Sequence, residues 1–176
     1  MLARKTTHSN QTIIIGIDPG YDRLGWSIGT LTNTYALITA GCIQTDKKKS
    51  IFERYNTIIV ELEKIIQKHQ PSEAGIETLF FSKNTTTALR VSESRGVVIT
   101  CLLQSGCRVF EYNPVEIKQA VTGSGSATKP AVEKMVRMQT NLPNTNKLID
   151  DAIDAIAVGI THAVKGRMTK LTQRLA

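Results

Sequence analysis

The chain contains few cysteines, and none has the spacing of a metal-binding motif. Only three of the 176 residues are cysteines, Cys42, Cys101 and Cys107, and each lies in an apolar stretch. An odd number of cysteines in such surroundings predicts reduced thiols in the core of a cytoplasmic protein. The three histidines lack zinc-type spacing too, so no zinc site is expected, and His162 is interpreted as a helix-end residue.

Long apolar runs and internal repeats are also absent. No uncharged run approaches the ~20 residues that span a bilayer, and residues 1–11 lack the apolar segment of a secretory signal. We expect residues 1–11 to be a flexible extension, 12–164 to be one domain, and 165–176 to be a basic tail that frays. The 15 acidic against 22 basic residues leave a net charge of +7, which suits a polyanionic partner but is weak support alone.

The periodicity of apolar residues predicts an α/β fold with a mixed five-stranded sheet. Three strands pair antiparallel first, and two more strands then alternate with helices and join in parallel. Because the first and fifth strands show little polar alternation, helices are expected on both faces. A capping box from Ser50 to Glu53 opens the first helix. The predicted strands cover residues 12–17, 24–31, 34–44, 74–78 and 108–112, and the predicted helices cover 50–69, 84–105, 113–121, 129–140 and 148–162.

Three aspartates stand among isoleucines and alanines on the last predicted helix. Asp150 and Asp151 suit a helix N-terminus, where a carboxylate favours the helix dipole. Asp154 lies one turn further in, so capping does not explain it. Because an uncompensated carboxylate is expensive to desolvate, this arrangement favours a bound cation.

Two further carboxylates lie at the ends of predicted strands. Asp18 follows the first strand and Glu77 ends the fourth. Alone, each has a simpler explanation: Asp18 opens a turn, and Glu77 faces solvent. If the two strands are neighbours, a helix packed across their edge brings Asp151 and Asp154 to the same point. Such an oxygen-ligand set suits Mg²⁺ or Mn²⁺, and two such ions can promote phosphoryl displacement.

A series of short motifs runs through the chain in a specific order. They are Gly-Ile-Asp18-Pro-Gly, Ile-Glu77-Thr-Leu-Phe80, Ser-Lys83-Asn84, Ala-Leu-Arg90, Ser94-Arg95-Gly96, Gly123-Ser-Gly125-Ser-Ala127-Thr-Lys129 and Asp151-Ala-Ile-Asp154-Ala-Ile-Ala. From Ile13 to Ala163 the series resembles the bacterial RuvC-type Holliday junction resolvases, which have a ribonuclease H-like fold.

The resemblance implies a structure-selective endonuclease acting in DNA recombination and repair. A homodimer would hydrolyse two opposing strands of a four-way DNA junction symmetrically, with Mg²⁺ as cofactor, two ions per site, and Mn²⁺ as a substitute. A branch-migration complex of junction-binding and motor proteins would be its partner, with no membrane involved. The implied location is the bacterial cytoplasm, at the nucleoid.

The resemblance also assigns roles to individual residues. The catalytic metal ligands would be Asp18, Glu77, Asp151 and Asp154, which leaves Asp150 as a helix cap. The DNA-binding residues would be Phe80, Lys83, Asn84, Lys118 and Lys129. A ring such as Phe80 can stack on unpaired bases, although a core position is the alternative. Lys118 and Lys129 would hold phosphate oxygens, or would be ordinary surface lysines.

The chain departs from the family pattern after the first motif. Tyr21-Asp22-Arg23 stands where the family more often has a hydroxyl residue and then a basic one, so Asp22 adds negative charge near the site. For the dimer surface we favour the apolar second helix, through Val97, Val98 and Leu102.

Three other functions stay open at this stage. Gly-Ile-Asp-Pro-Gly also resembles the phosphate loop of actin-like kinases, but these need a second subdomain. A ribonuclease H-like nuclease on another nucleic acid would keep the fold and the metal site. A non-catalytic junction-binding module would have an acidic cluster that repels DNA, which argues against it.

Overall fold

The computed structural model of the protein describes residues 11–32, 34–79, 85–142 and 150–175. Strands and helices follow one another in the predicted order. The strands are β1 (Ile13–Asp18), β2 (Arg23–Leu31), β3 (Tyr35–Gln44), β4 (Glu73–Glu77) and β5 (Arg108–Tyr112). The helices are α1 (Ile51–His69), α2 (Thr85–Gln104), α3 (Pro114–Thr122), α4 (Lys129–Gln139) and α5 (Asp150–Leu175).

The strands form one mixed sheet in the order β3-β2-β1-β4-β5. β1 pairs antiparallel with β2, and β2 with β3, whereas β1–β4 and β4–β5 are parallel. The predicted mixed sheet is therefore confirmed. Since β1 and β4 are parallel neighbours, their carboxyl ends lie at the same edge.

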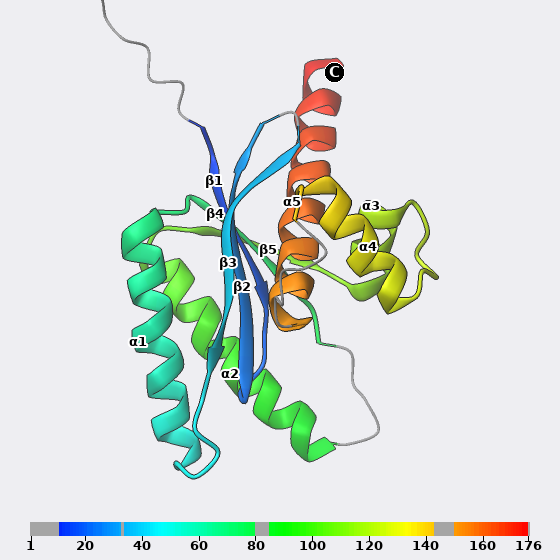
Figure 1. Cartoon of the computed structure of the whole chain (residues 1–176). Helices are drawn as coiled ribbons and strands as arrows, with labels where there is room; N and C mark the ends of the chain where they lie inside the picture. Colours follow the sequence, from blue (N-terminus) through cyan, green and yellow to red (C-terminus); the bar gives the residue numbers. More distant parts are fainter. Residues whose placement is uncertain (1–10, 33, 80–84, 143–149, 176) are drawn as a thin grey trace, which may run out of the picture.

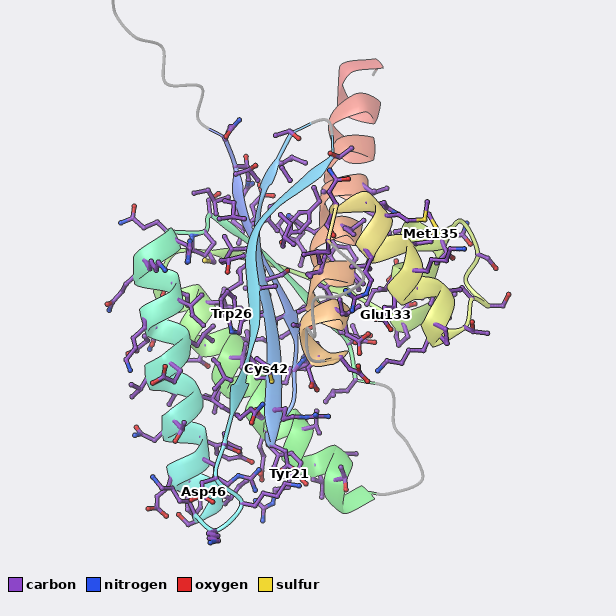
Figure 2. The ribbon with its side chains drawn as sticks, viewed as in Figure 1. Tyr21, Trp26, Cys42, Asp46, Glu133 and Met135 are labelled. Atoms are coloured by element: carbon purple, nitrogen blue, oxygen red, sulfur yellow. The ribbon has the colours of Figure 1, made fainter. Side chains whose placement is uncertain are left out.

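Helices cover both faces of the sheet, as predicted (Figure 1). α1 and α2 lie on one face, over Ile15 and Ile17 of β1, and α5 lies on the other, over Ile14. The alternation of β1 side chains thus supplies both cores. Trp26 of β2 packs against the α1–α2 core, between the sheet and α1 (Figure 2). α3 and α4 form an outer layer against α5.

Glycines allow α5 to pack almost directly on the sheet backbone. A Cβ at Gly16 would lie 2.3 Å from the carbonyl oxygen of Ala155, and one at Gly25 would lie 1.9 Å from that of Asp151. Ser27 Oγ donates a hydrogen bond to the same Ala155 oxygen at 2.9 Å. The first turns of α5 are therefore held against β1 and β2, beside the carboxyl end of β1.

α5 differs from the prediction at its C-terminal end. It continues to Leu175, so residues 165–175, which were expected as a separate basic tail, are helical in this structure. His162 consequently lies inside α5 and is not a helix-end residue. It is buried, with Nε2 2.7 Å from Glu73 Oε2 and Nδ1 2.7 Å from the Tyr112 hydroxyl oxygen. These bonds join α5 to β4 and β5.

Two of the three residues expected at the dimer surface are not accessible, whereas Val97 of α2 is half-buried and the surface itself stays a prediction. Val98 and Leu102 are completely buried in the core between α2 and the sheet, so they cannot contact a second copy. β5, an edge strand, is mostly exposed, although its sequence indicated cover on both faces.

All three cysteines are free, and Cys101 and Cys107 are buried as predicted, whereas Cys42 is only partly buried. None of the helices in the described ranges combines the length and apolar composition needed to cross a membrane.

Candidate metal and nucleic-acid site

The parallel pairing of β1 and β4 brings the first two predicted carboxylates together. Ile17 and Ile76 are register partners, and Asp18 and Glu77 follow them directly. Both are only partly exposed. The condition stated from the sequence, that these two strands be neighbours, is therefore met.

The two strand carboxylates share one electrostatic environment with the aspartates of α5. Burial, followed by repulsion from Glu77, Asp154 and Asp151, raises the pKa of Asp18 to about 8. Burial and the charge of Asp154 raise the pKa of Glu77 to about 7. Burial is the larger cause of both shifts, and the neighbouring carboxylates add to it. Without a counter-ion, the cluster resists full ionisation near neutral pH.

Asp154 lies one turn inside α5, as the sequence indicated, and has a lysine partner. Lys129 Nζ is 3.1 Å from Asp154 Oδ2 and 3.8 Å from Asp150 Oδ2. Burial raises the pKa of Asp154, although the hydrogen bond from Lys129 acts in the opposite direction. Asp150 is exposed, in the first turn of the helix. That position agrees with a helix-dipole role for Asp150.

Asp151 has a different partner, Arg23 at the start of β2. Arg23 Nε lies 3.2 Å from Asp151 Oδ2, and the arginine side chain is 54% exposed. The geometry of the pair is not that of a hydrogen bond. Asp151 Oδ2 is buried and accepts no hydrogen bond from the described part of the chain. A buried carboxylate oxygen in this condition has spare capacity for a cation.

Lys118 and Lys129 line a pocket of about 260 Å³ together with two of the carboxylates. Glu77 and Asp154 form its acidic wall, and Ile117 of α3 lies in its apolar lining. The charges of both lysines lower the pKa of Glu77, in opposition to burial. The structure thus brings both predicted lysines to the acidic cluster, Lys118 from α3 and Lys129 from the start of α4.

The residues of the cluster are chemically suited to a hard divalent cation. They offer carboxylate oxygens, one of them orphaned, and their mutual repulsion would be relieved by positive charge. Among the described side chains, no three carboxylates, histidines or cysteines already form a ligand arrangement. Arg23 and Lys129 serve as counter-charges instead. A cation would therefore have to draw the carboxylates together and compete with these two side chains.

Three predicted DNA contacts lie outside the described residues. Phe80, Lys83 and Asn84 belong to residues 80–84, and their proposed roles stay predictions.

The sequence interpretation missed the partners of Asp22. The Arg54 guanidinium pairs with it, and Lys47 Nζ lies 3.5 Å from it. Although burial acts the other way, the hydrogen bond and charge of Arg54 lower the pKa of Asp22. A signal was available, because Arg54 lies four residues before Ile58 on the buried stripe of α1. An arginine on an apolar stripe implies a buried anionic partner. The negative charge of Asp22 is thus compensated locally.

Comparison with known proteins assigns the family. The family model described as crossover junction endodeoxyribonuclease RuvC matches residues 14–162. A protein of that name from Brachyspira hyodysenteriae is 40% identical over 157 residues, which cover 89% of this chain and 96% of the relative. The one from Pelotomaculum thermopropionicum is 43% identical over 152 residues, which cover 86% and 92%.

Solved structures agree with the sequence comparison. RuvC of Thermus thermophilus in complex with a Holliday junction substrate superposes with a TM-score of 0.84 and 28% identity, covering 90% of this chain and 96% of that one. The fowlpox virus resolvase, at 17% identity and a TM-score of 0.57, shares the fold alone. The predicted ribonuclease H-like fold is confirmed. The chain belongs to the RuvC family of crossover junction endodeoxyribonucleases.

Proposed function

We infer that the chain is a structure-selective endonuclease that resolves four-way (Holliday) DNA junctions. Family membership supports the reaction, and the similarity to a junction-bound relative supports the substrate. The observation that carries most weight is the convergence of Asp18 and Glu77 with Asp151 and Asp154. In a module that only binds DNA, these carboxylates would repel the phosphates and weaken binding.

We assign the role of metal ligands to these four carboxylates. Mg²⁺ is the cation that the oxygen donors suit best, with Mn²⁺ as a substitute and two ions as the proposed number. When bound, the cation would supply Lewis-acid activation of the scissile phosphate and of the attacking water. We also propose a homodimer that cuts opposing strands, a branch-migration complex as partner, and action on the nucleoid in the bacterial cytoplasm.

The lysines of the pocket would stabilise charge on the phosphate. Lys129 is held at the cluster by Asp154, and Lys118 lines the same pocket. Placed there, ammonium groups neutralise the charge that builds on non-bridging oxygens during displacement. Lys118 and Lys129 are therefore assigned to the substrate, and the carboxylates to the cation.

Cleavage of end-labelled DNA tests the proposal. A mobile four-way junction, plain duplex and an RNA–DNA hybrid are incubated with Mg²⁺ and either the native chain or Asp154→Asn. We expect paired symmetric nicks in the junction alone and none with the variant, because Asp154 lies inside the cluster. Cleavage of the hybrid with the junction spared would replace the substrate and keep the site. Tight junction binding without cleavage by the native chain would contradict the nuclease assignment.

A further inference from the structure

A second pocket lies beside the carboxylates and is lined in part by Asp151. Its volume is about 530 Å³, and its lining includes Gly20, Tyr21, Arg23, Lys47 and Asp151. Arg23 and Lys47 are exposed, so their cationic ends are available to a ligand entering from solvent. Asp151 is the residue that this pocket shares with the acidic cluster.

The backbone beneath this pocket is held rigidly by Arg54 of α1. Its guanidinium donates to the Tyr21 carbonyl oxygen at 3.0 Å and lies over the Tyr21 ring, 4.9 Å from the centroid. Thr45 Oγ1 donates to the same carbonyl at 2.8 Å. Figure 2 shows Tyr21 at the end of the molecule where α1 begins. The backbone preceding Arg23 is thus anchored, while its side chain extends into solvent.

The charges of the pocket depend on what Asp151 binds. Asp22 is already compensated by Arg54, so the remaining negative charge is that of Asp151, which holds Arg23. A divalent cation bound to the orphaned Asp151 oxygen would repel the guanidinium and weaken this ion pair. Arg23 would then present uncompensated positive charge next to the cation, beside Lys47, whose ammonium group lies 3.5 Å from Asp22. A planar guanidinium is well suited to phosphate oxygens.

We propose that Arg23 exchanges partners during catalysis, leaving Asp151 when the cation binds and then holding a backbone phosphate of the DNA in this second pocket. This inference rests on the proposed function and extends it. Arg23 is a positioning residue that couples cation binding at the carboxylate cluster to the affinity for DNA. The ion pair with Asp151 keeps the affinity for DNA low until a cation is bound.

A double-mutant cycle without metal tests the exchange directly. Binding of a fluorescent four-way junction is measured by anisotropy in EDTA for the native chain, Arg23→Ala, Asp151→Asn and the double variant. Asp151→Asn releases Arg23, so removing Arg23 should then weaken binding roughly tenfold and lower the log–log salt slope by about 1. In the native background Asp151 still retains Arg23, and the loss should be markedly smaller. Equal losses in both backgrounds would mean that Arg23 acts only through net charge, and the proposal would fail.

Two further measurements separate the exchange from a structural role. Mn²⁺ binding without DNA, followed by electron paramagnetic resonance, should be several-fold tighter in Arg23→Ala, because a competing positive charge is removed. When junction binding is measured in the presence of Ca²⁺, the salt dependence of the affinity should fall in Arg23→Ala. Arg23→Lys should retain most of it. Unchanged Mn²⁺ affinity, or no rescue by lysine, would overturn the proposal.

The matched control is Lys64→Ala on the outer face of α1. It removes one positive charge whose partner, Glu61, is not part of the site. Binding and the cycle should be unaffected by it. Junction binding and cleavage by the native chain are recorded in the same series. Their absence would refute the proposed function, whereas their presence without coupling between Arg23 and Asp151 would refute this inference alone.

Discussion

At the scale of single residues, the main property of the site is the unfavourable free energy of bringing ionised carboxylates close together. Asp18 is the extreme case, since burial and three neighbouring carboxylates raise its pKa from 3.8 to about 8. Such a group stabilises the folded state only while it is protonated. The arrangement is unfavourable for the free chain and becomes favourable when a cation is bound.

The pH dependence of stability follows from this shift. Between pH 3.8 and about 8 the folded chain retains a proton on Asp18 that the unfolded chain has released. The free energy of unfolding of the metal-free protein should therefore fall as the pH rises across this window. Asp18→Asn should flatten the dependence and raise the metal-free Tm at pH 8 by roughly 2–8 °C.

Calorimetry between pH 5 and 8, in EDTA and in Mg²⁺, measures this effect. Mg²⁺ should stabilise the native chain most at high pH, where the carboxylates are charged, and should do less for Asp18→Asn. Parallel pH profiles for the two proteins in EDTA would show that Asp18 is not the group responsible.

Lys129 is the second residue with a specific prediction. Because its ammonium group lies 3.1 Å from Asp154 and lines the pocket beside the carboxylates, Lys129→Met should slow single-turnover cleavage on the order of 10²-fold. Lys134→Met, an exposed lysine of the same helix, is the control and should cleave at the native rate. Equal losses in both variants would indicate a general charge effect.

At the scale of elements, the distance between α5 and the sheet decides where two of the carboxylates lie. That distance is set by backbone contact at glycines. Gly25→Ala would place a methyl group 1.9 Å from the Asp151 carbonyl oxygen, so α5 must shift. We expect a loss of about 1–3 kcal/mol in the free energy of unfolding. Cleavage should fall by up to about 10²-fold, since a displacement near 1 Å disrupts a catalytic geometry.

Gly166→Ala is the matched control, on α5 itself. A Cβ there meets nothing within 4 Å, so the change should leave cleavage unaltered and slightly stabilise the helix. Urea unfolding and cleavage assays on both variants give the comparison. Native stability and activity of Gly25→Ala would show that α5 does not depend on this close approach.

At the scale of the whole molecule, the net charge of +7 and the acidic cluster act in opposite directions on DNA. Junction affinity should fall steeply with salt, because phosphate neutralisation releases counter-ions. It should increase when a cation fills the cluster. In EDTA at pH 9, where Asp18 is ionised because its pKa is about 8, Asp18→Asn should bind more tightly than the native chain. Anisotropy titrations at several salt concentrations measure both effects. Weaker binding by Asp18→Asn would contradict this electrostatic account.

The sequence by itself determined the order and kind of the elements. Apolar periodicity, the Ser50–Glu53 capping box and the turn residues are local signals, and they predicted the mixed sheet with helices on both faces. It also singled out Asp154, because a carboxylate one turn inside an apolar helix has no local explanation. Local chemistry was sufficient for these conclusions.

Only the tertiary structure decided which side chains meet. Arg23 and Asp151 are 128 positions apart in the chain, and their contact depends on the packing of α5 against β2. The burial of Val98 and Leu102, and the bonds of His162 to Glu73 and Tyr112, likewise follow from how α2 and α5 pack. Periodicity reports that a face is apolar, but it does not report which surface covers it. The pairing of Arg23 with Asp151 could therefore not be inferred from the sequence, whereas the carboxylates and Lys129 were identified from it.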